Sequence, residues 1–222
     1  MRPWSIYSPQ GRLRRVIFST ALLGSAMVTV GAFSLPAHAS ADATKSKTTA
    51  YSISCQAGIV GTGSETVTAT NVYPASVLPG AKFTISWHSV TAVSKTQDEA
   101  AWALGARSFK GKVTTIDYNS SDATPKSVNV AGTKGIPTGG NLIGPPNYGM
   151  PLIYTPLKGS PNAVTPSFTA GKKGTDNVSP GVDDATLTLY SGTNGTGTAI
   201  ATVTANCSAP SKPTIIAAIP VS

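Results

Sequence analysis

The chain has 222 residues and a formal net charge of +8, which overstates its basic character beyond the N-terminus. Taking the four arginines of residues 1–39 from 17 basic residues leaves 13 against 9 acidic ones, a net charge of +4. Nucleic-acid sites need clustered basic side chains and usually aromatic platforms, and this sequence has neither, so nucleic acid is excluded as a predicted partner. A mildly basic surface is compatible with anionic cell walls or glycans.

The N-terminus has the features of a secretory signal peptide. Its arginines are followed by an uncharged stretch from Val16 to Leu35 and by Ala-His-Ala at 37–39. This order predicts a signal peptide over residues 1–39 with cleavage before Ser40. The alternative is an uncleaved anchor helix, because the apolar run is long enough to span a bilayer. We therefore expect a secreted or extracellular protein, attached to the cell surface or free, with 183 residues in a single domain.

The two cysteines, Cys55 and Cys207, lie in strand-like stretches near the two ends of this domain. An even number of cysteines in an exported chain predicts a disulfide. A catalytic thiol would need a base close by, and His88 is the only histidine beyond residue 39. Two cysteines and one histidine at these spacings match no zinc pattern, and we expect no metal and no cofactor.

Residues 40–49 are small and polar, which predicts a flexible leader before a domain over residues 50–207. Residues 51–55, 65–72 and 82–90 alternate as half-buried strands do, with Trp87 predicted in the core and His88 outside. Thr96 and Glu99 have the spacing of a capping box, which predicts a helix of about two turns that stops at Gly105. Glu65 is interpreted as a solvated strand residue, and Asp98 as a charge at the start of the helix.

Residues 135–166 form an irregular excursion that holds 7 of the 14 prolines beyond residue 39, so we expect at most short edge strands there. The excursion is unusually apolar for a loop. Its apolar side chains are the candidate binding residues, unless they fold back onto the core: Leu142, Ile143, Tyr148, Met150, Leu152, Ile153 and Tyr154.

A polar turn is predicted over residues 174–184, followed by two strands around the Asn-Gly pair at 194–195. Residues 208–222 are interpreted as a C-terminal tail or an extra edge strand. Together these elements predict an all-β fold, an antiparallel β-sandwich of about seven to nine strands with one short helix. A small β-barrel is the alternative.

Three landmarks occur in order: Tyr-Ser-Ile-Ser-Cys at 51–55, Pro-Ala-Ser-Val-Leu-Pro-Gly at 74–80, and Leu-Gly-Ala-Arg-Ser-Phe-Lys-Gly at 104–111. Over Tyr51 to Lys112 the chain resembles secreted actinobacterial β-sandwich domains of uncharacterised function. The resemblance implies export and a sandwich fold, and it implies no catalytic residue.

No catalytic motif is recognised. The sequence lacks a Gly-x-Ser-x-Gly elbow and a phosphate-binding loop, and His88 sits within a predicted strand. We therefore expect an exported, non-enzymatic binding or surface-associated protein that makes its contacts through loops. The alternative is a carrier of an apolar small molecule, or a membrane-interacting protein, that uses residues 142–154. A hydrolase is the third hypothesis.

Overall fold

The structure is a computed structural model that describes residues 43–145, 152–155 and 164–222. The chain divides into two units, residues 1–39 and residues 40–222, and every described residue belongs to the second unit. The predicted signal peptide lies outside the described residues, and so do Tyr148 and Met150. Within the described part, no helix is both long enough and apolar enough to cross a membrane.

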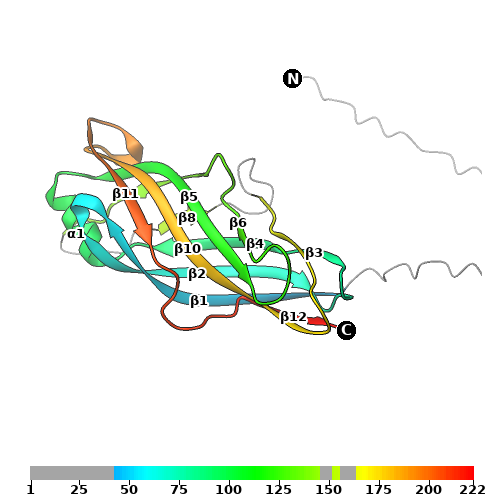
Figure 1. Ribbon diagram of the computed structural model, residues 1–222. Coiled ribbons are helices and arrows are strands. Elements are labelled where there is room, and N and C mark those ends of the chain that lie inside the picture. Colours follow the sequence, from blue (N-terminus) through cyan, green and yellow to red (C-terminus); the bar gives the residue numbers. More distant parts are fainter. Residues whose placement is uncertain (1–42, 146–151, 156–163) are drawn as a thin grey trace, which may run out of the picture. The chain divides into compact units, whose positions relative to one another are not determined.

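The second unit is built mainly from antiparallel strands (Figure 1). Ten of them form one sheet, in the order β6-β5-β10-β11-β1-β2-β4-β8, with β7 also paired to β5 and β12 to β10. Their bounds are β1 Thr44–Ala57, β2 Thr62–Pro74, β4 Ser86–Ala92, β5 Ser108–Ser120, β6 Ser127–Asn129, β7 Ile136–Asn141, β8 Leu152–Thr155, β10 Gly174–Tyr190, β11 Ala199–Cys207 and β12 Ala217–Val221. A second sheet pairs β3 (Lys82–Thr84) with β9 (Ser167–Thr169).

The described residues also form one α-helix, α1 (Lys95–Ala103), and two 3₁₀ turns, η1 (Gly58–Val60) and η2 (Thr193–Gly195). The predicted all-β antiparallel fold with one short helix is confirmed. Twelve strands are present in the described residues, more than the seven to nine expected. The predicted strand over 82–90 is divided into β3 and β4, and the excess also includes the short strands β8 and β9, which have four and three residues. Alternation cannot be recognised over so short a length.

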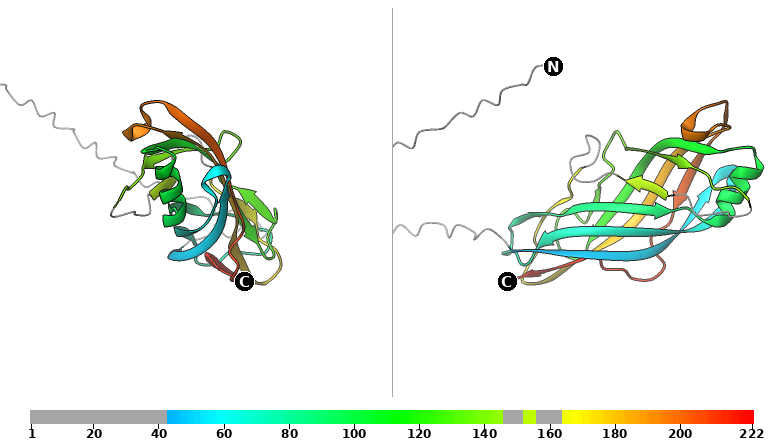
Figure 2. Two further views of the ribbon diagram at one scale, coloured as in Figure 1. Left: turned by 90° about the vertical axis from the view of Figure 1, so that its left-hand side faces the viewer. Right: turned by 180° about the vertical axis from the view of Figure 1, so that it is seen from behind.

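The large sheet curls into a half-barrel around its core (Figure 2). Trp87 on β4 and Tyr118 on β5 come from opposite ends of the strand order, yet their ring centroids are 6.1 Å apart. The Tyr118 hydroxyl also donates a hydrogen bond of 2.8 Å to Asn71 Oδ1 on β2. One continuous sheet therefore supplies both faces of the core. The architecture combines the face-to-face packing of a sandwich with the curvature of a barrel.

Residues 44–49 belong to β1, so the prediction of a flexible leader over 40–49 is wrong for this part. Their backbones pair with β2 from Thr44 opposite Pro74 to Thr49 opposite Ala69. Most of their side chains are exposed. A strand that gains backbone hydrogen bonds without burying an apolar face leaves no periodic pattern in its sequence.

The predicted strand over 82–90 is divided between two sheets. β3 ends at Thr84 and β4 begins at Ser86, while the backbone N–H of Ile85 donates to Pro166 O at 3.1 Å. Phe83 stacks on Phe168 of the small sheet with ring centroids 5.6 Å apart. Trp87 is buried in the large sheet, as predicted. The alternation is continuous across Ile85, which is why the sequence shows no break.

The predicted polar turn over 174–184 is wrong, because these residues form the first part of β10. Irregular pairing with β5 between Pro180 and Asp183 accommodates the proline, which cannot donate to a regular ladder. Asp176 is fully buried and its Oδ1 accepts hydrogen bonds from three donors: Ser120 Oγ, Ser121 Oγ and Asp122 N. The polar composition of residues 174–184 predicted a turn because the sequence does not show that Asp176 is buried against residues 120–122.

α1 begins two residues earlier than the predicted capping box implies, and it uses a different cap. Ser94 is the N-cap: the backbone N–H of Gln97 donates to Ser94 Oγ at 3.2 Å, and Ser94 Oγ donates to Gln97 Oε1 at 2.9 Å. Thr96 is therefore inside the helix, and the predicted Thr96–Glu99 capping box is wrong. The predicted stop is correct, since Gly105 adopts the positive φ of 90° that ends helices.

The excursion over 135–166 contributes β7, beside β5, and β8, which pairs with β4 at the end of the strand order. Residues 208–222 contribute β12, which pairs with the first residues of β10 from Val221 opposite Gly174 to Ala217 opposite Val178. Ile216, Ala217 and Ile219 are fully buried, so this segment completes the core.

Candidate functional site

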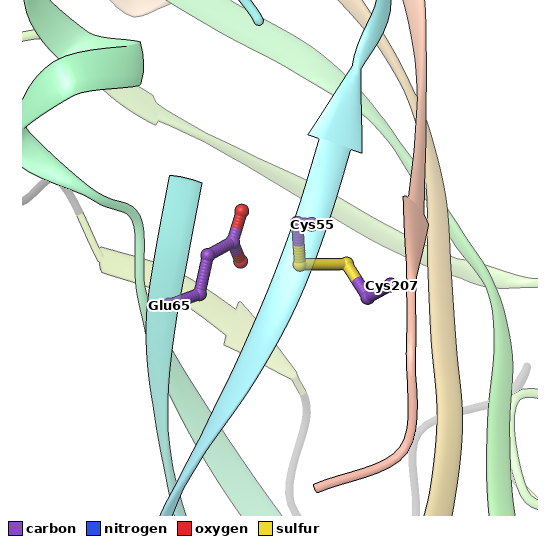
Figure 3. Close-up of side chains that lie close together, drawn as sticks. All are labelled: Cys55, Glu65 and Cys207. Carbon is purple, nitrogen blue, oxygen red and sulfur yellow. A yellow bond between two sulfur atoms is a disulfide. The ribbon is translucent and has the colours of Figure 1, made fainter. Parts of the chain in front are cut away.

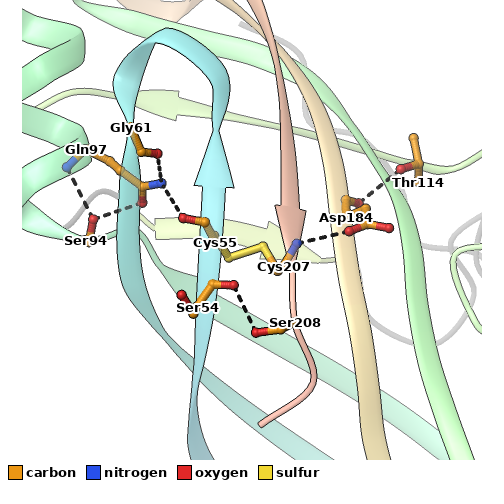
Figure 4. The surroundings of a disulfide bond; sticks show 9 residues. All are labelled: Ser54, Cys55, Gly61, Ser94, Gln97, Thr114, Asp184, Cys207 and Ser208. Carbon is orange, nitrogen blue, oxygen red and sulfur yellow. Dashed lines mark hydrogen bonds between the residues drawn. A yellow bond between two sulfur atoms is a disulfide. The ribbon is translucent and has the colours of Figure 1, made fainter. Parts of the chain in front are cut away.

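The disulfide predicted from the sequence is confirmed, between Cys55 on β1 and Cys207 on β11. The two residues are direct partners in the β1–β11 ladder, and both are buried. Figure 4 shows the contacts around them. Gln97 Nε2 donates to the carbonyl of Cys55 at 3.2 Å, and the backbone N–H of Cys207 donates to Asp184 Oδ1 at 3.0 Å. The disulfide therefore joins two strands that also form hydrogen bonds with α1, through Gln97, and with β10, through Asp184.

Gly63 makes room for α1 beside this bridge. It lies opposite Cys55 in the β1–β2 ladder, and a Cβ atom at this position would be 1.9 Å from Ser94 Oγ and 2.6 Å from Gln97 Oε1. Gln97 Nε2 also donates to the carbonyl of Gly61 at 3.3 Å. The start of α1 is thus fixed against the hairpin between β1 and β2 by a close approach that only glycine permits.

A cavity of about 60 Å³ lies among the strands and α1, and Cys207 of the disulfide is part of its lining. It exceeds the roughly 10–15 Å³ that one water molecule requires on this measure. Its walls are mainly apolar and come from β1, β5, β10, β11, η1, α1 and the residues that follow β4 and β7: Ala57, Val60, Val93, Ala101, Phe109, Val113, Leu142, Ala185, Leu187, Leu189, Ala205 and Cys207. Its polar lining residues are Glu65, Thr91, Gln97, Asp98 and Asp183.

Glu65 on β2 is one of three carboxyl groups in this lining. Its side chain extends beside the disulfide (Figure 3), with a carboxylate oxygen within 4.8 Å of both sulfur atoms. Only 6% of the residue is exposed, and burial raises its pKa to about 7. The interpretation of Glu65 as a solvated residue is therefore wrong. Its position in phase with Val67, Ala69 and Asn71 was the available signal, because all four face the core.

Asp183 on β10 is the second carboxyl group. It lies opposite Cys207 in the β10–β11 ladder, so Glu65 and Asp183 approach the bridge from β2 and β10. Burial is the main cause that raises the pKa of Asp183 to about 8, and the negative charges of Glu65 and Asp184 add to it. The sequence placed this residue in a polar turn and gave no indication that it faces a cavity.

Asp98 on α1 is the third, and it is 1% exposed. Neither of its carboxyl oxygens has a hydrogen-bond partner among the described residues. Burial raises the pKa of Asp98 to about 6, and the negative charge of Glu99 raises it further. The backbone N–H of Ile143 lowers this pKa, although it does not form a hydrogen bond of good geometry with the carboxyl group. The helix-dipole interpretation of Asp98 missed its burial, since Gln97, Asp98 and Ala101 form the inner face of α1.

The only group in the described residues with metal-ligand proximity consists of Cys55, Glu65 and Cys207. Both sulfur atoms are in the disulfide, and metals bind cysteine as thiolate. This leaves a single carboxylate, which does not make a metal site. His88 is half-buried on the opposite face of β4 from Trp87 and does not line the cavity.

The candidate binding residues of the excursion lie in different surroundings. Leu142 is 9% exposed, lines the cavity, and its backbone N–H donates to Arg107 O at 2.9 Å. Ile143 is 43% exposed. Leu152, Ile153 and Tyr154 have their backbones in β8, paired with Ala92, Thr91 and Val90 of β4. Among the members of the segment whose side chains the structure describes, Leu142 lines the cavity together with the three carboxyl groups.

The comparisons with protein-family models, curated proteins and solved structures find no match. The actinobacterial resemblance of residues 51–112 stays a prediction. The cavity and its chemistry are therefore the basis for assigning a function to this protein.

Proposed function

We propose that this protein is an exported, non-enzymatic binding protein that holds a small ligand in the cavity of its curled sheet. The observation that supports the proposal most directly is a mainly apolar cavity that contains a buried carboxyl group, Asp98, without a hydrogen-bond partner in the described residues. Buried polar groups are almost always partnered in folded proteins, so an orphaned one facing a cavity favours a ligand. The confirmed disulfide is compatible with an oxidising compartment.

The volume limits the ligand. Sites for drug-sized molecules usually enclose about 300–1,000 Å³, and this cavity has about 60 Å³. A lipid chain would require the walls to move apart, whereas a molecule of a few heavy atoms needs much less rearrangement. The volume therefore restricts the hypothesis of an apolar-ligand carrier to ligands of a few heavy atoms. Leu142, a residue of the excursion over 135–166, would contact such a ligand.

Nuclear magnetic resonance of isotope-labelled protein tests this proposal. Titration with 1-butanol and with butylammonium should shift the resonances of Leu142 and Leu187 in a saturable way. Ala205 is 5% exposed and lines the cavity, so Ala205→Leu should remove the shifts by filling the space. Ala199→Leu, an exposed substitution on the same strand, should leave them unchanged.

Saturable shifts that persist in Ala205→Leu would place the binding elsewhere and contradict the proposal. The sequence-based hypothesis of contact with cell walls or glycans through loops has a separate readout. Soluble cell-wall fragments should then shift resonances of loop residues while leaving Leu142 and Leu187 unaffected.

A further inference from the structure

We propose that the ligand of this cavity is a small organic cation, a primary ammonium group attached to a short apolar body. This inference rests on the proposed function, because it assigns the chemical class of ligand to the same site. It follows from two features of the lining: the sign of every ionisable group in it, and the apolar side chains that make up most of the remaining surface.

All ionisable side chains that line the cavity are acidic. Glu65, Asp98 and Asp183 come from β2, α1 and β10, and no lysine, arginine or histidine is among the described residues of the lining. The neighbouring charges have the same sign, since Asp184 adjoins Asp183 and Glu99 adjoins Asp98. An anionic ligand would be repelled by these groups, while a cation would supply the missing opposite charge.

Asp98 is the residue at which the missing positive charge would bind. The residue is 1% exposed and both of its oxygens lack hydrogen-bond partners in the described part of the chain. A buried ionised carboxylate without a partner is costly, whereas an N–H donor from a cation would satisfy it and neutralise its charge. An ammonium group has three such donors, so it can satisfy both oxygens of Asp98.

The remaining walls favour an organic body on the cation. Phe109, Val113, Leu142, Leu187 and Leu189 supply hydrocarbon surface to the same cavity. A calcium ion would need six to eight oxygen ligands, and magnesium would keep several water molecules, so neither uses apolar walls. A short alkyl or aryl group attached to the ammonium would bury its surface against these side chains.

Binding of such a cation should be linked to pH. Burial raises the pKa values of Glu65, Asp98 and Asp183 to about 7, 6 and 8, so each binds its proton well above the ordinary range. A cation favours the ionised forms and therefore displaces protons. Its affinity should rise as the pH is increased from about 5 to about 8, the range in which these groups ionise.

Three probes of similar size and different charge test the inference: butylammonium, 1-butanol and butyrate. Each is titrated into the disulfide-bonded protein at about pH 8 while the resonances of Leu142 and Leu187 are followed; butylammonium stays charged there, as the lysine side chain does. Concentrations up to about 50 mM are needed, because a probe of so few atoms binds weakly. We expect butylammonium to bind at least about tenfold more tightly than 1-butanol, and butyrate more weakly than either.

Asp98→Asn and Glu99→Gln form a matched pair on the same helix. Asp98→Asn should weaken butylammonium binding at least about tenfold and change 1-butanol binding much less, because the alcohol carries no charge. Glu99 is outside the lining and forms an exposed ion pair with Lys95 at 3.5 Å, so Glu99→Gln should change both affinities less than about twofold. Glu65→Gln provides a second, independent carboxyl variant if Asp98→Asn does not fold.

The possible results separate this inference from the proposed function. If 1-butanol binds as tightly as butylammonium in the unmodified protein, the cavity is a binding site but the cation inference is wrong. If butyrate binds most tightly, the inference is also wrong, because the charges of the lining would not select the ligand. If none of the probes shifts Leu142 or Leu187, the proposed function itself fails.

Discussion

Asp176 and Asp98 are both buried aspartates, but they have different surroundings. Asp176 Oδ1 accepts hydrogen bonds of 2.8 to 3.2 Å from three donors, and only its Oδ2 lacks a partner in the described residues, whereas both oxygens of Asp98 lack one. Asp176 joins β10 to the end of β5 and the turn after it. Asp98 faces a cavity. Burial alone therefore does not separate a structural carboxyl group from a candidate binding group; the partners do.

Removing the partnered aspartate should have the largest effect. Asp176→Ala would leave Ser120 Oγ, Ser121 Oγ and the backbone N–H of Asp122 without their common acceptor. We expect a loss of about 3 kcal/mol in the free energy of unfolding, measured by denaturant titration. Thr175→Ala, an exposed neighbour on the same strand, should cost less than about 0.5 kcal/mol. Equal losses of stability in the two variants would contradict a structural role for Asp176.

The next largest effect should be the pH dependence of the unliganded protein. Glu65 has a pKa raised by burial from 4.5 to about 7, so the folded state retains a proton that the unfolded state has already lost. Stability is then greatest at low pH and falls as the pH rises through this window, by about 2 kcal/mol from pH 5 to pH 8 for Glu65 alone. Denaturant titrations at both pH values should show a smaller fall in Glu65→Gln. An identical fall in both proteins would contradict the assignment.

Neutralising the unpartnered aspartate should have a smaller effect, in the opposite direction to Asp176→Ala. Asp98→Asn removes a buried charge at high pH and should stabilise the protein by about 1–2 kcal/mol at about pH 8. The gain should nearly disappear at about pH 5, because burial holds the pKa of Asp98 at about 6 and the carboxyl is then already neutral. Thermal unfolding at both pH values measures the difference. Destabilisation at pH 8 would indicate that Asp98 has partners after all.

The smallest effect concerns the helix that carries Asp98. Ser94→Ala removes the acceptor of the Gln97 backbone N–H and should cost about 1 kcal/mol in the free energy of unfolding. Thr96→Ala, which the sequence-based capping box would make the costly change, should cost less than about 0.5 kcal/mol because Thr96 is exposed within α1. The reverse order of the two costs would restore the original assignment of the cap.

The sequence predicted features that depend on local pattern. Alternation identified the strands of the core and the burial of Trp87, and the even number of cysteines identified the disulfide. The three cavity carboxyl groups were missed because each has an ordinary local explanation: a polar strand residue, a helix-start charge and a turn residue. Their place at the cavity depends on elements distant in the chain, and only the folded structure shows that Glu65, Asp98 and Asp183 line one space.

Gly63 limits how this protein can vary. Its hydrogen atom occupies a place where a methyl group would meet the hydroxyl of Ser94 and the amide of Gln97 before any other group. Even the substitution to alanine would therefore push the β1–β2 hairpin and α1 apart. Gly63→Ala would displace the helical wall of the cavity while all three acidic side chains remain in the sequence. It would thus separate the shape of the site from its charge.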